Sequence, residues 1–228
     1  MIFGLIRKWR RRRLLAAPEP VEWHDWLAAD LPFYGQLTRD EQRRLREQTR
    51  VFLAEKTFEA RDGLELTDRI KLSIAAQACL LTLNLSYDGY RRVARVIVFA
   101  STFGTPGREG LVVTDRPTLG VVHYGGPVAL AWDATQGGAI NPEDGHNVVF
   151  HEFAHKLDLA DHLADGTPPM DGRDLFERWV GVMTERYEAL REDFDKGRRN
   201  VLDHFGAQNP AEFFAVATET FFEKGDSL

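Results

Sequence analysis

One segment is apolar on every side when it is drawn as a helix, and it sets the strongest limit on the fold. The segment "TDRIKLSIAAQACLLTLNL" covers residues 67–85 and begins with Thr67 and Asp68, either of which can open a helix. A helix without a polar face cannot lie at the surface, so other elements must cover it. We therefore expect a central core helix here, in a chain of 228 residues that is long enough to bury it within one domain.

The elements around this segment predict an α+β fold with a small sheet. Thr38 and Glu41 form a capping-box pattern that opens a helix running to about Lys56. Short β-branched segments separated by glycine, proline or aspartate then predict strands, at residues 93–100, 110–113, 119–126 and 127–133. Three helices are expected after the strands: one from a cap at Asp144 to about Ala160, one over residues 174–196, and one that begins at "NPAEFF". This order differs from the alternation of a doubly wound sheet.

The first twenty residues have a composition of their own. They hold Arg7, Lys8 and the run from Arg10 to Arg13, and they end at Pro18 and Pro20. We therefore divide the chain into a basic N-terminal tail (residues 1–20) and a domain (residues 21–228). The tail is expected to be a solvated arm, with contact to anionic lipid or nucleic acid as the alternative.

Composition also narrows the compartment and the partners. The net charge of −6 exerts no bulk attraction on nucleic acid, so a protein partner or a small neutral substrate fits better. We find neither a secretory signal nor a run of about 18–20 apolar residues that could span a bilayer. The one cysteine, Cys79, lies in an apolar run and cannot form an internal disulfide. We therefore expect a cytoplasmic location.

The motif "HEFAH" at residues 151–155 predicts a metal site. Residues four apart on a helix project from one face, so His151 and His155 can direct ring nitrogens at one point. Zinc is the metal expected for two imidazoles and a carboxylate, and Glu152 is placed to take a proton from water at that metal. The pattern alone arises by chance on the order of once in a hundred chains of this length. Asp158, one turn after His155, could orient a ligand or simply end the helix.

The sequence pattern leaves the third ligand open. The downstream candidates are Glu177, Glu185, Glu188, Glu192, His204, Glu212 and Glu219. Those of the long charged helix lie mostly on what is expected to be its solvated face. Glu212 and Glu219 stand among phenylalanines, where a buried carboxylate needs a partner, but they lie about 10 Å apart along a helix and one metal cannot easily bind both. Glu212 also fits the start of a helix, after Asn209 and Pro210.

"HEFAHKLD", followed about sixty residues later by "NPAEFFAV" and "TETFF", resembles the Mlc titration factor A family of bacterial zinc peptidases. It is also similar to the catalytic domain of anthrax lethal factor. The resemblance covers residues from about Trp23 to Glu223. It implies a zincin-like domain with a small mixed sheet and an active-site helix, in which His151, His155 and Glu212 bind zinc and Glu152 is the general base. Glu219 then becomes a residue that supports a ligand.

Two features depart from the pattern of that family. Where the family has a tyrosine thought to support the oxyanion, seven residues before the glutamate ligand, this chain has Phe205, which cannot donate a hydrogen bond. His204 or another donor would have to replace it, because one lost oxyanion donor typically costs about 100- to 1000-fold in rate. The chain also ends at "EKGDSL", where members of the family usually continue.

Three functions are compatible with these features. The first is a zinc metallopeptidase with aminopeptidase-like action on short peptides. For this function "GPVALAW" (126–132) is the candidate edge strand that a peptide pairs with, and a core strand is the alternative for the same segment. The second, implied by the resemblance, is a catalytically weak regulatory protein that titrates an Mlc-like transcriptional repressor from DNA. The third is hydrolysis of a non-peptide amide or ester by the same chemistry. Glu152 favours the first function and Phe205 the second.

Overall fold

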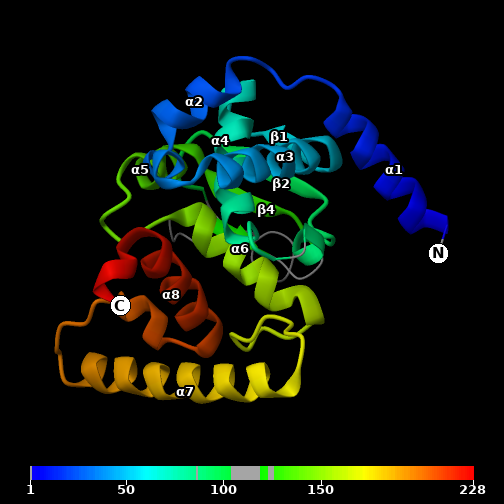
Figure 1. The fold of residues 1–228 in the computed structure, drawn as a ribbon. Helices are drawn as coiled ribbons and strands as arrows, with labels where there is room; N and C mark the ends of the chain where they lie inside the picture. The colour runs from blue at the N-terminus through cyan, green and yellow to red at the C-terminus, as the bar shows by residue number, and fades with distance from the viewer. Residues whose placement is uncertain (1, 86, 104–118, 123–125) are drawn as a thin grey trace, which may run out of the picture.

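The computed structural model describes residues 2–85, 87–103, 119–122 and 126–228, which form a helix-rich α+β fold (Figure 1). The helices are α1 (Ile2–Ala16), α2 (Trp23–Asp30), α3 (Arg39–Glu55), α4 (Asp68–Leu81), α5 (Trp132–Ile140), α6 (Val148–Asp158), α7 (Arg173–Asp195) and α8 (Pro210–Lys224). The strands are β1 (Thr57–Ala60), β2 (Arg95–Phe99), β3 (Gly120–Val122) and β4 (Val128–Ala131). Among these described helices, none combines the length and the apolar composition needed to cross a bilayer.

The core forms around α4, as the all-round apolar segment predicts. Thr67 caps this helix by accepting the backbone N–H of Ile70, and every residue from Leu72 to Leu81 is buried. Helix α3, which opens with the expected capping box at Thr38, packs on α4 from one side and α6 packs on it from another. The rings of Phe52 and Phe153 meet at 5.7 Å between centroids and join the two helices that flank α4.

The sheet is mixed, and its strand order is β1-β2-β4-β3. Strands β1, β2 and β4 are parallel, and β3 runs antiparallel to β4 with Gly120 opposite Leu130. All four residues of β4 are buried. Of the two alternatives for "GPVALAW", the edge strand is therefore wrong and the core strand is confirmed, because β4 has a neighbour on each side and β3 is the described strand at that edge.

Other sequence expectations differ from the structure in detail. The described strands match three of the expected segments, whereas residues 110–113 lie outside the described residues. Strand β1 and helices α2 and α5 were not predicted. The basic segment forms helix α1, which packs on α3, whereas the boundary between a tail (1–20) and a domain (21–228) stays a prediction.

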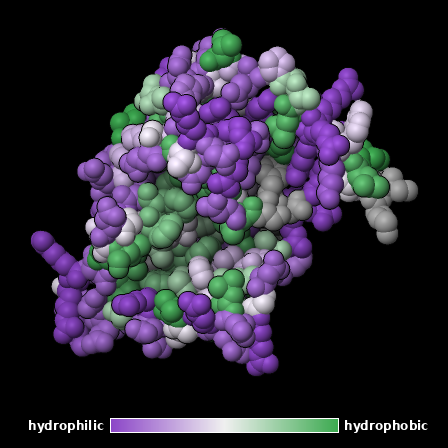
Figure 2. All heavy atoms as spheres, viewed as in Figure 1, coloured by the Kyte–Doolittle hydropathy of each residue, from purple (hydrophilic) through white to green (hydrophobic). Residues whose placement is uncertain are grey.

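Helices α7 and α8 form a second layer beside α6. Figure 1 shows α7 along the outer side of the molecule, with α8 between it and α6. A small apolar cluster of Leu190, Leu202, Phe213 and Val216 joins α7 to α8. Figure 2 shows polar side chains over most of the face seen in Figure 1, with apolar side chains gathered in a hollow near its middle. This second layer brings α8 against α6, the helix that carries the two histidines.

Candidate metal centre

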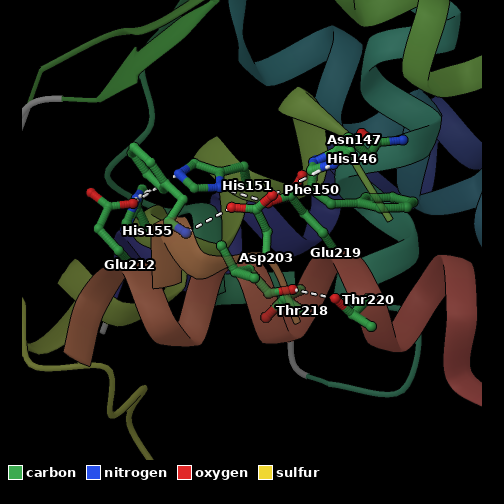
Figure 3. A network of polar contacts seen from close by, with 12 residues as sticks. His146, Asn147, Phe150, His151, His155, Asp203, Glu212, Thr218, Glu219 and Thr220 are labelled. Carbon is green, nitrogen blue, oxygen red and sulfur yellow. Dashed lines mark hydrogen bonds and ion pairs between the residues drawn. The ribbon is translucent and has the colours of Figure 1, made fainter. Parts of the chain in front are cut away.

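Two histidines of α6 and one glutamate of α8 bring three ligand atoms together (Figure 3). The Nε2 atoms of His151 and His155 lie 3.2 Å apart, and Oε2 of Glu212 lies 3.0 Å from the first and 3.3 Å from the second. A tetrahedral metal with bonds of about 2.0–2.1 Å holds its ligand atoms roughly 3.3–3.4 Å apart. The observed separations therefore fit one small cation, and these three residues form a group that could hold it.

Helix α6 owes its position to Asn147, its N-cap. The side chain of Asn147 accepts the backbone N–H groups of Val149 and Phe150 and donates to Oε1 of Gln77 in α4. The expected cap, Asp144, is wrong: it lies four residues before Val148, the first residue of the helix, and it accepts the backbone N–H of His146 instead. The cap fixes the first turn of α6 against the core, and the two histidine rings follow from it at one-turn spacing.

Glu219 of α8 holds the first histidine in place from behind. Its Oε1 lies 2.7 Å from Nδ1 of His151, and its Oε2 accepts the backbone N–H of Asn147 at 2.6 Å. A carboxylate on Nδ1 fixes the ring orientation and leaves Nε2 to face the cluster, as metal-binding histidines usually require. The role suggested for Glu219 by the resemblance thus has a direct geometric counterpart.

The acidic groups set the charge of the centre. Burial lowers the pKa of His151, but its contacts with Glu212 and Glu219 outweigh this and raise the pKa to about 10. Burial raises the pKa of Glu212, and the two histidines outweigh it and bring the pKa to about 2. Glu212 is therefore a carboxylate at neutral pH, and together with Glu219 it makes the centre a favourable place for a cation.

Glu152 lies beside the cluster and under strand β3. Its side chain is only 5% exposed, and burial raises its pKa to about 7 in spite of the two neighbouring histidines. Gly120 of β3 passes so close that a Cβ atom there would lie 2.5 Å from Oε1 of Glu152. A carboxyl group with a pKa near 7 can both accept and donate a proton at neutral pH. Gly120 was not among the residues singled out from the sequence.

The centre opens into a cavity of about 510 Å³, a size typical of ligand sites. Its lining consists of Gly120, His151, Glu152, His155, Leu159, Ala164, Phe205, Asn209, Ala211 and Glu212. The ring of Phe205 is 48% exposed, and its centroid lies 5.9 Å from that of His151. The residue that departs from the family pattern therefore stands at the cavity, and it offers no hydroxyl group there.

The remaining candidates lie elsewhere. The ring of His204 packs against Phe194, with centroids 5.5 Å apart, so it does not replace the missing donor in the cavity lining. Asp158 is buried and accepts the backbone N–H of Thr167, which anchors the loop after α6. Four glutamates are exposed on α7 and away from the cavity: Glu177, Glu185, Glu188 and Glu192.

Comparison with known proteins agrees with this geometry. The family model described as glucose-regulated metallo-peptidase M90 matches residues 6–228. The chain is 37% identical over 226 residues to the protein slr2042 of Synechocystis sp., covering 96% of this chain and 82% of that protein. It is 30% identical over 223 residues to proteins named Mlc titration factor A from Yersinia pestis and Yersinia pseudotuberculosis, covering 91% of this chain and 78% of each relative. These matches confirm the resemblance drawn from "HEFAHKLD" and "NPAEFF".

Proposed function

Because the chain belongs to the family of glucose-regulated metallo-peptidases M90, we propose that it is a zinc-dependent peptidase. In this proposal His151, His155 and Glu212 bind the metal and Glu152 is the general base. The observation that carries the proposal is the convergence of two Nε2 atoms and one carboxylate oxygen at separations of 3.0–3.3 Å, next to a buried carboxyl group. A purely structural metal site would have no use for Glu152.

Zinc is the metal that we propose for the centre. Two imidazole nitrogens and one carboxylate oxygen are one of the donor sets found in catalytic zinc sites, which leave a fourth position open toward the solvent or substrate. The cavity in front of Glu212 provides that open side. Zinc, when bound, supplies a Lewis acid that polarises a carbonyl oxygen and lowers the pKa of water.

In this proposal Glu152 transfers protons and Glu219 orients a metal ligand. Glu152 takes the proton of the attacking water and returns it to the leaving amine, and a pKa near 7 suits both transfers. Glu219 keeps Nε2 of His151 directed at the centre through its contact with Nδ1. Burial of Glu152 beneath β3 keeps bulk water from competing for its proton.

We propose a peptide in extended form as the substrate, bound along β3. Gly120 of this strand lines the cavity and lies directly beside Glu152. An extended peptide can add to the edge of a sheet through main-chain hydrogen bonds, which would place its carbonyl groups over the centre. Short peptides and aminopeptidase-like action follow from the family resemblance.

The single cysteine, Cys79, is buried with its pKa raised to about 12 by burial, which is compatible with the cytoplasmic location that we propose.

The proposal is tested by metal content and peptide turnover measured together. We would compare the native protein with Glu152→Gln and with Glu188→Gln, a matched change on the exposed side of α7. We expect about one zinc per chain in all three proteins, and turnover of a peptide library in the native protein and Glu188→Gln only. Native protein without zinc would refute the ligand assignment. Equal turnover in Glu152→Gln would refute the role of Glu152. Turnover of non-peptide amide or ester probes, without turnover of peptides, would show that the substrate is not a peptide.

A second candidate function is regulation by binding an Mlc-like transcriptional repressor. The relatives from Yersinia carry the name Mlc titration factor A. Phe205 stands at the cavity where the family pattern has a tyrosine, and its ring brings no hydroxyl group to the site. Such a role would tolerate weak catalysis, because binding a protein partner does not need Glu152.

Two variants separate the candidate functions. If catalysis is the function and Phe205 limits it, Phe205→Tyr should raise kcat by about 10-fold or more, since an oxyanion donor is typically worth about 100-fold. If binding is the function, purified Mlc should bind the native protein and Glu152→Gln with equal affinity. An unchanged kcat in Phe205→Tyr would show that the missing hydroxyl group does not limit the reaction. The absence of Mlc binding would refute the regulatory candidate.

A further inference from the structure

Helix α1 exposes apolar side chains on one face. Leu5 is 65% exposed, Trp9 is 59% exposed and Ile6 is 43% exposed. At 100° per residue these three side chains fall within an arc of about 100°. Figure 2 shows apolar side chains beside polar ones at the edge of the molecule where Figure 1 places α1. Contiguous exposed apolar side chains mark a binding surface more often than single ones do.

The opposite face of α1 is fixed to α3. Arg11 makes a bidentate ion pair with Glu55, in which two guanidinium nitrogens lie 2.6 and 2.8 Å from the two carboxylate oxygens. Arg50 of α3 donates to the carbonyl oxygens of Leu14 and Ala17 at 2.7 and 2.8 Å, near the end of α1. Arg11 lies more than about 100° around the helix from both Leu5 and Ile6. These contacts therefore hold the apolar face outward, away from the body of the protein.

Basic side chains surround the apolar face. Lys8 and Arg10 lie on its two sides and are both exposed. Arg12 lies on the same side of the helix as Leu5 and Trp9, about one turn after Trp9. Arg13 lies over the ring of Trp9 at 5.7 Å. Helix α1 carries six basic residues and no acidic one, although the whole chain has a net charge of −6. The remainder of the chain is thus strongly acidic, and an anionic surface would attract α1 and repel the rest.

We propose that α1 is a docking helix for the surface of an anionic lipid bilayer. Its three exposed apolar side chains would enter the boundary between headgroups and acyl chains, where tryptophan is favoured. The basic residues on both sides would meet the lipid phosphates. This partner fits better than nucleic acid, because binding to phosphates alone would leave Leu5, Ile6 and Trp9 without a role. The proposal does not depend on the function of the metal centre.

Vesicle binding of the full chain tests the proposal. The probes are vesicles of phosphatidylcholine alone and vesicles in which about a third of the lipid is phosphatidylserine. Native protein should cosediment with the anionic vesicles at least about 10-fold more strongly than with the neutral ones. The triple variant Lys8→Gln, Arg10→Gln and Arg12→Gln should lower binding by about 100-fold, since each basic residue near such a surface contributes about fivefold.

A second variant tests the apolar face. Leu5→Ser with Trp9→Ser should lower binding to anionic vesicles by about 10-fold or more at constant charge. Four other tryptophans contribute to the fluorescence of the native protein. A blue shift on binding that the variant without Trp9 lacks would therefore be assigned to Trp9. All these side chains are exposed, and each variant should keep the thermal midpoint of the native protein.

Matched changes on other surfaces serve as controls. The charge control is the triple variant Arg178→Gln, Arg186→Gln and Arg199→Gln, and the apolar control is Leu175→Ser with Val182→Ser. Both control variants should bind like the native protein.

Several outcomes would overturn the proposal. One is equal binding to neutral and anionic vesicles, and another is an equal loss in α1 variants and controls. Binding to a short DNA duplex without binding to vesicles would assign α1 to nucleic acid. A dimer that dissociates in Leu5→Ser with Trp9→Ser would assign the face to a second copy of this chain.

Discussion

Replacing Gly120 by alanine should displace the carboxyl group of Glu152 without touching the three proposed metal ligands. The added Cβ would lie 2.5 Å from Oε1, 2.6 Å from Cγ and 2.8 Å from Cδ of Glu152, where ordinary contacts begin at 3.4 Å. Glu152 is 5% exposed, so its side chain has little space to move. Restoring ordinary contact requires the carboxyl group or β3 to shift by about 1 Å, and a misplacement of this size can cost about 100-fold in rate.

We therefore expect Gly120→Ala to lower kcat by about 100-fold while KM and zinc content stay close to native. Overpacking of this kind should also lower the free energy of unfolding by about 1–3 kcal/mol. Peptide turnover, metal analysis and urea unfolding of the zinc-loaded protein measure the three quantities. The control is Gly137→Ala in α5, where an added Cβ meets no atom within 4 Å and should leave kcat unchanged.

Three results would refute this reasoning. A kcat of Gly120→Ala within about twofold of native, in a protein with native zinc content, would show that close packing by Gly120 does not position Glu152. Loss of zinc in the same variant would show that the strain reaches the ligands instead. Equal effects of Gly120→Ala and Gly137→Ala would mean that the contact with Glu152 has no special weight.

Three further predictions concern the surroundings of the centre. Glu219→Gln removes the carboxylate behind His151 and should weaken zinc binding by about 10- to 100-fold in competition with a chelator; unchanged affinity would contradict the supporting role. Gly166 and Gly172 both have positive φ, but only a Cβ at Gly166 would collide with the backbone at the start of α8. In urea unfolding, Gly166→Ala should therefore lower the free energy of unfolding by about 1–3 kcal/mol more than Gly172→Ala does. Burial raises the pKa of Glu223 to about 7, so the native state binds this proton more tightly than the unfolded state and loses stability as the pH rises from about 4.5 through 7. The free energy of unfolding of Glu223→Gln should therefore increase by about 1–2 kcal/mol relative to that of the native protein between pH 5 and pH 8, a value reduced for the partial exposure of the group. A difference that does not change with pH would contradict this prediction.

The elements that the sequence predicts well are those specified by local signals. The capping box at Thr38 and the all-round apolar pattern after Thr67 each act within one helix, so α3 and α4 follow from them directly. Strand β1 has four residues, and it is held by its pairing with β2, which no local pattern can show. Helix α5 contains Gly137 and Gly138, which disfavour a helix by propensity, so only its packing against its neighbours keeps it helical.

Long-range pairing also explains the errors around the active-site helix. Asp144 and Asn147 are both good capping residues, and the sequence offers no means to choose between them. The structure selects Asn147 because Gln77 and Glu219, distant in sequence, bind its side chain and its backbone N–H. The order of strands β4 and β3 in the sheet is likewise set by pairing across the fold, so the identity of the edge strand could not be predicted from "GPVALAW" alone.

The ambiguity between Glu212 and Glu219 has a geometric answer that the sequence partly contained. Seven residues along a helix place them about 10 Å apart, which argues against two ligands on one metal. An imidazole ring, however, has two nitrogens that point in different directions. Because α8 packs along α6, Glu212 reaches Nε2 of His151 while Glu219 reaches Nδ1 of the same ring. The same spacing that argues against a shared metal thus allows Glu212 to contact Nε2 of His151 while Glu219 contacts Nδ1 and fixes the orientation of the ring.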